Sequence, residues 1–142
     1  MSKLVFTAAQ IEQIHREGEA AYPNECCGAI LGLEEGETRR VDRLRPLSNR
    51  FEAGEQYHRF RVDPLELVRI EKEAGKAGML VLGFYHSHPD HPAQPSEYDR
   101  SHAWPFYSYV IVSIMKRKAA EMTSWQLDPV TEKFQAEAIS RV

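Results

Sequence analysis

The chain contains, at residues 79–99, the stretch MLVLGFYHSHPDHPAQPSEYD. Its first seven residues form an unbroken apolar run, which is typical of a central β-strand buried on both faces. The prolines that follow, up to Pro95, cannot continue a sheet. From Ser96 to about Ala103 the sequence favours a short helix. The stretch therefore predicts a central strand, a polar loop and a short helix, in that order.

Potential metal ligands lie on both sides of this loop. His86 and His88 are two residues apart, and side chains at that spacing on an extended chain point to the same side, so both can reach one ion. Ser96 and Asp99 are three apart, so on a helical turn they share a face. Asp99 can then supply a third ligand, with the Ser96 hydroxyl beside it. Three protein ligands leave a fourth position for water, as in catalytic zinc sites.

These residues resemble the signature of the JAMM (MPN-plus) zinc metalloprotease family, which is His-x-His, seven residues, then Ser-x-x-Asp. That family also uses an upstream glutamate close to a Cys-Gly and a short apolar strand, and Glu25, followed by Cys26-Cys27-Gly28, is similar to it. The resemblance runs from the first expected helix to the strand at 107–114. It implies zinc ligands His86, His88 and Asp99, Glu25 as the general acid/base, and Ser96 as a donor to the substrate oxyanion.

The spacing of Ser96 and Asp99 is equally typical of a helix capping box. We expect the two roles to compete, because an aspartate that holds zinc cannot cap the helix fully.

The resemblance also implies a substrate class. The chain has no room between Asp99 and the next strand for a large insertion, so it resembles the small prokaryotic branch of the family. Members of that branch hydrolyse the bond after the C-terminal Gly-Gly of ubiquitin-like or sulfur-carrier proteins, releasing a C-terminal extension or a cysteine. The carrier tail is expected to bind as an added strand, with residues 48–57 as a clamp or as an exposed loop. The alternatives are an isopeptidase that removes a ubiquitin-like modifier from lysine and a non-catalytic MPN scaffold module.

The other histidines and the two cysteines are weaker candidates for a functional site. His86 to His91 also resembles the metal signature of metallo-β-lactamase-fold hydrolases, but that fold needs two further histidines well downstream and only His102 follows. We expect His15, His58 and His102 not to be ligands. The adjacent Cys26 and Cys27 are expected to pack in the core rather than act as nucleophile or thiolate ligand.

Composition bounds the remaining possibilities. The chain has 142 residues, a net charge of −3 and 42% hydrophobic residues, which is ordinary for one globular domain spanning 1–142. The absence of a basic block argues against a nucleic-acid partner. The longest apolar run is too short to span a bilayer, and the start of the sequence has no signal-peptide pattern. Together with the neighbouring cysteines, this predicts a cytoplasmic protein without a membrane partner. The sequence leaves a homodimer open.

Patterning along the chain predicts a mixture of helices and strands. Strands are expected at 4–6, 27–33, 38–44, 58–62, 79–85, 107–114 and 121–127, with an uncertain last element at 134–139. Helices are expected after Thr7, after Asp63 and after Ser96, each of which is a good N-cap residue. Because strands and helices do not alternate strictly, we predict an α+β fold with a single mixed β-sheet flanked by helices. The family resemblance implies a JAMM/MPN (cytidine-deaminase-like) architecture with zinc at the end of a central strand.

Overall fold

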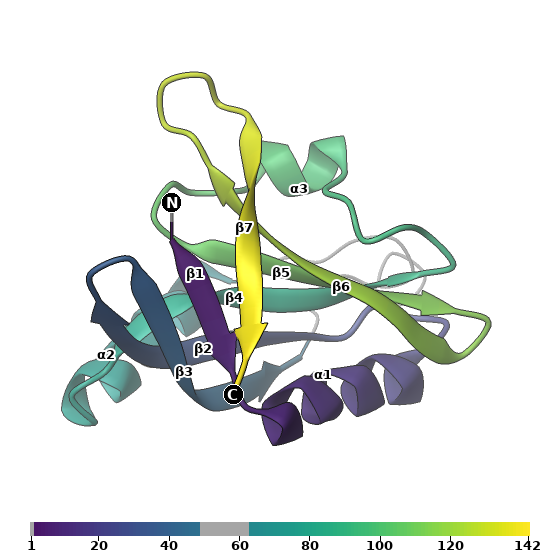
Figure 1. Ribbon diagram of the computed structural model, residues 1–142, viewed down its shortest axis with the longest axis horizontal. Coiled ribbons are helices and arrows are strands. Elements are labelled where there is room, and N and C mark those ends of the chain that lie inside the picture. The colour runs from purple at the N-terminus through teal and green to yellow at the C-terminus, as the bar shows by residue number, and fades with distance from the viewer. Residues whose placement is uncertain (1, 49–62) are drawn as a thin grey trace.

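The computed structural model describes residues 2–48 and 63–142, and within them the strands close into a barrel (Figure 1). The strand order around the barrel is β1-β3-β2-β4-β5-β6-β7. The strands are β1 (Lys3–Phe6), β2 (Cys27–Glu35), β3 (Thr38–Leu47), β4 (Leu80–Pro89), β5 (Ser108–Met115), β6 (Lys118–Leu127) and β7 (Phe134–Arg141). The α+β class is confirmed in its mixture of helices and parallel and antiparallel strands. The predicted single mixed sheet with helices is confirmed in part, because the sheet closes on itself into a barrel.

The first strand closes the barrel. β1 pairs in parallel with β3, where Lys3 lies opposite Thr38, and also in parallel with β7, where Lys3 lies opposite Ala138. Both edges of the sheet are therefore used by one four-residue strand. Apolar patterning marks residues 4–6 as a strand but does not show which partners it takes, so the closure has no signal in the sequence.

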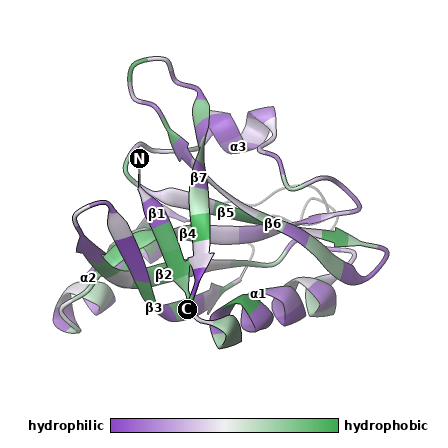
Figure 2. Ribbon diagram, in the orientation of Figure 1, coloured by the Kyte–Doolittle hydropathy of each residue, from purple (hydrophilic) through white to green (hydrophobic). Residues whose placement is uncertain are grey.

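Three helices accompany the strands in the described part of the chain. They are α1 (Ala8–Ala21), α2 (Pro64–Lys76) and α3 (Glu97–Ser101). Each begins at the predicted N-cap residue, and the Thr7 capping box of α1 is complete. In Figure 2, hydrophobic and hydrophilic residues alternate along α1, whose buried residues are Ile14 and Gly18. Helix α1 contacts β4, β5 and β6, whereas α2 contacts β2 and β4.

A β-bulge decides which way the end of β4 faces. In the pairing of β2 with β4, Ile30 lies opposite Gly83 but Leu31 lies opposite Val81, so Leu82 is an extra residue. After this bulge, Phe84 packs in the core cluster beside α2 and Tyr85 in the cluster that includes Ile14 of α1. Because alternate residues of a strand face opposite sides, His86 and His88 follow the face of Phe84. The bulge thus sets the side on which the two histidines emerge.

Several element boundaries differ from the sequence prediction. Strand β4 continues through His86 and His88 to Pro89, because β5 pairs with it in parallel as far as Pro89 and Ile114. The uncertain last element is strand β7, and α3 ends at Ser101 rather than near Ala103. The strand expected at 58–62 and the clamp expected at 48–57 lie outside the described residues except for Ser48.

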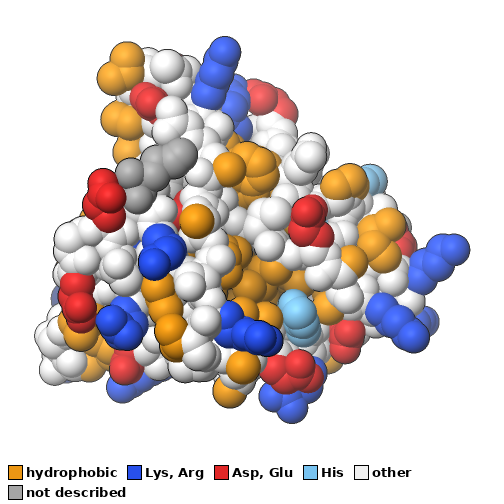
Figure 3. All heavy atoms as spheres, in the orientation of Figure 1, with side chains coloured by type: hydrophobic (Ala, Val, Ile, Leu, Met, Phe, Trp, Pro, Cys, Tyr) orange, Lys and Arg blue, Asp and Glu red, His pale blue; other side chains and the backbone are white. Residues whose placement is uncertain are grey.

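The surface of the described residues mixes charges of both signs. Figure 3 shows Lys and Arg side chains interspersed with Asp and Glu side chains on the face seen in Figure 1. Among the described residues, no helix is both long enough and apolar enough to cross a membrane.

Candidate metal centre

Two imidazole rings meet at the end of β4. His86 and His88 are almost fully buried, and their Nε2 atoms are 3.1 Å apart. Since the two residues lie on one face of an extended strand, their rings converge as the spacing predicted. The neighbour between them, Ser87, faces the other side, and its Oγ accepts a hydrogen bond of 2.8 Å from the Cys26 backbone N–H.

Asp99 on α3 meets both rings. Its Oδ1 is 3.3 Å from His86 Nε2, and its Oδ2 is 3.2 Å from His88 Nε2. The same Oδ2 accepts a hydrogen bond of 2.9 Å from the Ser96 backbone N–H, and the Asp99 N–H donates to Ser96 Oγ at 3.0 Å. The expected competition between capping and zinc ligation stays a prediction, but the capping box itself is complete. One rotamer completes the capping box and directs the carboxylate at the histidines.

The charge of Asp99 is favoured by its surroundings. Burial of the carboxyl group raises its pKa, but the two histidine rings and the Ser96 backbone N–H act in the opposite direction and lower the pKa well below its usual range.

A backbone carbonyl fixes the orientation of His88. Its Nδ1 lies 3.0 Å from the Pro92 carbonyl oxygen, which can only accept a hydrogen bond. Nδ1 must therefore carry the proton, which leaves Nε2 as the nitrogen that lies 3.2 Å from the Asp99 carboxylate and that could ligate a metal ion. Nδ1–H to carbonyl bonding is the usual support of a metal-binding histidine.

The donor set therefore fits a metal ion. The ligand atoms of His86, His88 and Asp99 all lie within 4.8 Å of one another. Two imidazole nitrogens and one carboxylate oxygen are a zinc-type set that leaves a coordination position open. Among the described residues, this is the group of histidine, cysteine and acidic side chains that could hold a metal ion.

Glu25 lies two residues before β2 and lines the same cavity as His88. The pairing of Cys27 with His86 and a hydrogen bond of 3.2 Å from the Ser87 N–H to the Cys26 carbonyl hold the two chain segments together. Glu25 is only 7% exposed. Burial, followed by the negative charge of Asp99, raises the pKa of its carboxyl group to about 9. A bound cation would oppose this shift and favour the carboxylate.

Glycine at position 28 has a steric reason. A Cβ atom there would lie 2.1 Å from Cζ of Tyr85, closer than any real contact. The buried Tyr85 hydroxyl donates a hydrogen bond of 2.6 Å to Glu17 Oε1 on α1, so its ring cannot move away freely. The glycine near Glu25 thus lets β2 approach β4 closely enough to bring Glu25 to the histidines.

One cavity joins the candidate residues. It has a volume of about 360 Å³, and it is lined by Glu25, His88, Pro89, His91, Pro92, Gln94, Pro95 and Ser96. The Ser96 hydroxyl accepts the Asp99 N–H, which leaves its own hydrogen for an acceptor in the cavity. The structure therefore brings together all five residues selected from the sequence. It adds the Pro92 carbonyl, which no side-chain pattern could have revealed.

The remaining candidates have other roles. The Asp90 carboxylate accepts hydrogen bonds from the Tyr22 hydroxyl and the Lys116 N–H, so it anchors a turn rather than joining the histidines. His102 stacks on Tyr98 with ring centroids 4.1 Å apart. Burial raises the pKa of Cys26 to about 11 and that of Cys27 still further, so both are protonated thiols. His58 lies outside the described residues.

The sequence matches the family described as prokaryotic homologs of the JAB domain over residues 7–128. The chain belongs to this family. The match includes every residue of the metal centre and Glu25, and it agrees with the JAMM resemblance of the motif. The metallo-β-lactamase alternative is excluded by this assignment.

Individual proteins support the same assignment. The chain is 39% identical to a desampylase of Haloferax volcanii, over 82% of this chain and 81% of the relative. It is 37% identical to a probable TtuB-protein conjugate cleaving protease of Thermus thermophilus, over 57% of this chain and 53% of that protein. The crystal structure of a JAB1/MPN domain protein from Archaeoglobus fulgidus shares the fold, with a TM-score of 0.59 and 18% identity, covering 100% of this chain and 97% of the other.

Proposed function

We propose that this protein is a zinc metallopeptidase that hydrolyses the bond after the C-terminal Gly-Gly of a ubiquitin-like or sulfur-carrier protein. The observation that carries the proposal is the convergence of His86 Nε2, His88 Nε2 and the Asp99 carboxylate beside a cavity lined by Glu25, His88 and Ser96. The complete residue set favours an enzyme over a non-catalytic scaffold, because a scaffold would have no use for a buried group of potential metal ligands.

Each residue has a chemical role in this proposal. His86, His88 and Asp99 hold the zinc ion. Bound zinc would polarise the substrate carbonyl and lower the pKa of water. Glu25, whose carboxylate form a bound cation favours, accepts a proton from the attacking water and returns it to the leaving amine. The Ser96 hydroxyl donates a hydrogen bond to the developing oxyanion. No covalent intermediate with the protein is required.

The walls of the cavity favour a substrate tail of glycine residues, which have no side chains. Pro89, Pro92 and Pro95 line it, and proline rings on a fixed backbone yield little to a bulky neighbour. A Gly-Gly segment could approach the metal where a β-branched residue would meet these rings.

A specific observation favours a second candidate. The name of the Thermus thermophilus relative describes cleavage of protein conjugates, which supports the removal of a ubiquitin-like modifier from a lysine. The chemistry at the metal would be unchanged, because only the leaving amine differs.

Intact-mass measurement tests both candidates. The substrates are a carrier ending in Gly-Gly plus a short extension, and the same carrier joined to a lysine side chain. We expect zinc-dependent cleavage at the Gly-Gly end, and loss of cleavage when the last glycine is changed to valine. Equal cleavage of the valine form, or cleavage that survives complete removal of zinc, would contradict the proposal. The ratio of the two cleavage rates distinguishes peptidase from isopeptidase.

A further inference from the structure

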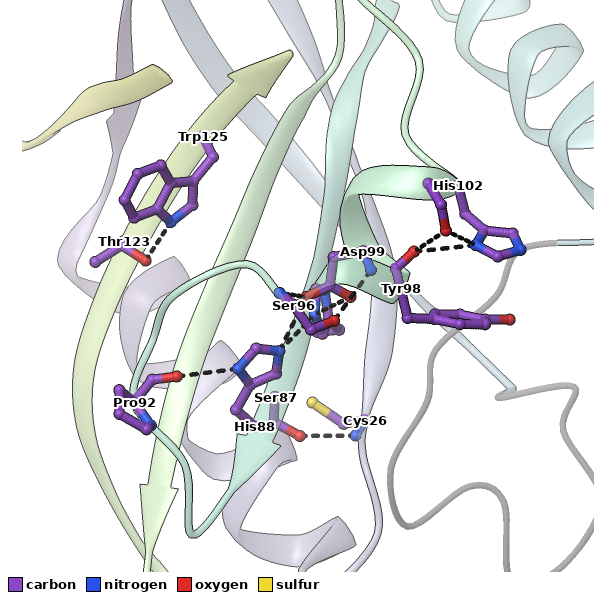
Figure 4. A network of polar contacts seen from close by, with 12 residues as sticks. Cys26, Ser87, His88, Pro92, Ser96, Tyr98, Asp99, His102, Thr123 and Trp125 are labelled. Atoms are coloured by element: carbon purple, nitrogen blue, oxygen red, sulfur yellow. Dashed lines mark hydrogen bonds and ion pairs between the residues drawn. The ribbon is translucent and has the colours of Figure 1, made fainter. Parts of the chain in front are cut away.

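We infer that Thr123, supported by Ser113, is a positioning residue for the metal ligand His88. The inference rests on the metal centre of the proposed function. Its basis is two hydrogen bonds to neighbouring carbonyls of the loop after β4: Thr123 on β6 donates to the Ala93 carbonyl, and His88 Nδ1 bonds to the Pro92 carbonyl, which Figure 4 shows. Ser113 lies opposite His88 in the pairing of β5 with β4, and Thr123 lies one strand further along the sheet, on β6.

The loop is held at consecutive carbonyl groups. Ser113 Oγ on β5 donates a hydrogen bond of 2.6 Å to the His91 carbonyl. Thr123 Oγ1 on β6 donates one of 2.6 Å to the Ala93 carbonyl. The Pro92 carbonyl between these two anchors is the group that accepts His88 Nδ1–H. The two hydroxyls therefore fix the peptide units on both sides of the acceptor on which the tautomer of His88 depends.

The Thr123 hydroxyl has its direction imposed by Trp125. The indole Nε1 lies 2.9 Å from Thr123 Oγ1, and an indole N–H is a donor only. The Thr123 oxygen must therefore accept from Trp125, which leaves its own hydrogen for the Ala93 carbonyl. Figure 4 shows the indole nitrogen and the Thr123 hydroxyl facing each other. The Thr123 hydroxyl therefore donates its hydrogen bond to the Ala93 carbonyl and not to water.

The loop after β4 depends on these hydrogen bonds because it lies between two cavities. Pro92 and Gln94 line the cavity of about 360 Å³ that contains Glu25 and His88. On the other side, Ala93 and Gln94 line a second cavity of about 320 Å³ whose remaining wall is formed by β6 and β7. A segment with space on both sides is not held by packing alone. Hydrogen bonds to neighbouring strands take over that task.

Loss of the Thr123 hydroxyl should therefore act on His88 at a distance. The Ala93 carbonyl, whose residue is fully buried, would lose its donor and the peptide could rotate towards the second cavity. The Pro92 carbonyl would move with it and release His88 Nδ1–H. Groups that orient a metal-binding histidine typically contribute tenfold to hundredfold to metal affinity.

The experiment compares Thr123→Val, which keeps the shape of the side chain but removes the donor, with Thr123→Ser, which keeps the donor. Thr131→Val, at an exposed threonine of the β6–β7 turn, is the matched control. The zinc dissociation constant of each full-length protein is measured by competition with a chelator. The tautomer of His88 is measured in the metal-free proteins by nitrogen NMR, so one readout does not need the metal. Thermal unfolding reports the fold.

We expect Thr123→Val to weaken zinc binding roughly tenfold to hundredfold and to reduce the Nδ1–H tautomer of metal-free His88. Thr123→Ser should restore both, and Thr131→Val should change neither. If Thr123→Val does not fold, Trp125→Phe removes the donor that directs the hydroxyl and should shift both readouts in the same direction. Unchanged affinity and tautomer in Thr123→Val, or a serine variant as weak as the valine variant, would overturn the inference. A wild-type protein that binds no zinc would instead contradict the proposed function, and the tautomer would still test the positioning.

Discussion

Two clusters of buried charge lie at different ends of β4, and they are built on opposite plans. Near its first residues, the Arg39 guanidinium is 1% exposed and donates to Glu34 Oε2 at 3.1 Å, to Ser108 Oγ at 2.6 Å and to the Leu82 carbonyl at 3.2 Å. Near its last residues, His88 Nε2 and the Asp99 carboxylate face each other. The first cluster contains its own cation, and the second is a group of side chains that could hold a metal ion.

The difference teaches how to tell a structural cluster from a functional one. At Arg39, donors meet acceptors, and the ring of Phe106 covers the guanidinium with Cζ 4.6 Å from its centroid. Its Nη2 alone has no hydrogen-bond partner among the described residues. Such a cluster stabilises the fold without help from a ligand. At His88 and Asp99, we expect stability and metal binding to be coupled, because a bound ion would interact with its ligands only in the folded chain.

The largest effect that would sharpen this comparison is catalytic. Glu25→Gln keeps the size of the side chain but cannot accept the proton of the attacking water. Loss of this general acid/base should lower the cleavage rate by roughly two to four orders of magnitude, while zinc remains bound because Glu25 is not a ligand. Steady-state rates on a Gly-Gly carrier, with metal content measured on the same samples, check this. A variant that holds zinc and cleaves at the wild-type rate would show that Glu25 has another role.

The second effect is a pH dependence of the free energy of unfolding that arises from Glu25, at the end of β4 that carries the histidines. Glu25 has its pKa raised from 4.5 to about 9 in the folded, metal-free protein. The folded chain therefore holds a proton that the unfolded chain has lost between these values, so the free energy of unfolding should fall as pH rises from about 4.5 to about 9. The loss is on the order of several kcal/mol.

Denaturant titrations in the presence of a chelator, at about pH 5 and about pH 9, measure this loss. Glu25→Gln has no titrating group at that position and should show a much shallower decline. Parallel declines in the two proteins would mean that the carboxyl group of Glu25 is solvated when the metal is absent.

The third effect belongs to the opposite cluster. Arg39→Met removes the cation and leaves the buried Leu82 carbonyl and Ser108 hydroxyl with one partner fewer. The free energy of unfolding should fall by about 2–3 kcal/mol, whereas the zinc affinity of the folded protein should stay unchanged. Denaturant unfolding and chelator competition on the same variant measure the two quantities. A large change in zinc affinity would show that the two ends of β4 are coupled, and the comparison would fail.

Local patterns were enough to predict which side chains meet at the candidate metal centre and where the helices start. The i,i+2 spacing of His86 and His88 and the capping box at Ser96 and Asp99 depend on neighbouring residues alone, so the sequence contains their geometry. Glu25 is different. Its proximity to the histidines requires the pairing of β2 with β4, and the sequence predicted it only through the family resemblance. The close approach at Gly28 and Tyr85 supplies the physical reason.

What could not be predicted depends on long-range pairing. Barrel closure requires Lys3 to pair with both Thr38 and Ala138, and an apolar strand of four residues does not specify two partners. Likewise, no pattern in the sequence predicts the bulge at Leu82. The Pro92 carbonyl that orients His88 is a backbone group, which carries no side-chain signature at all.

The most direct test of the central claim is metal stoichiometry. Wild-type protein and Asp99→Asn are purified in parallel, and zinc per chain is measured before and after incubation with zinc and removal of the excess. We expect one tightly bound zinc per wild-type chain, because two imidazoles and one carboxylate converge with an open position. Asp99→Asn removes the negative charge and should retain little or no zinc. A wild-type protein that purifies without zinc and cannot take it up would contradict the account of this site.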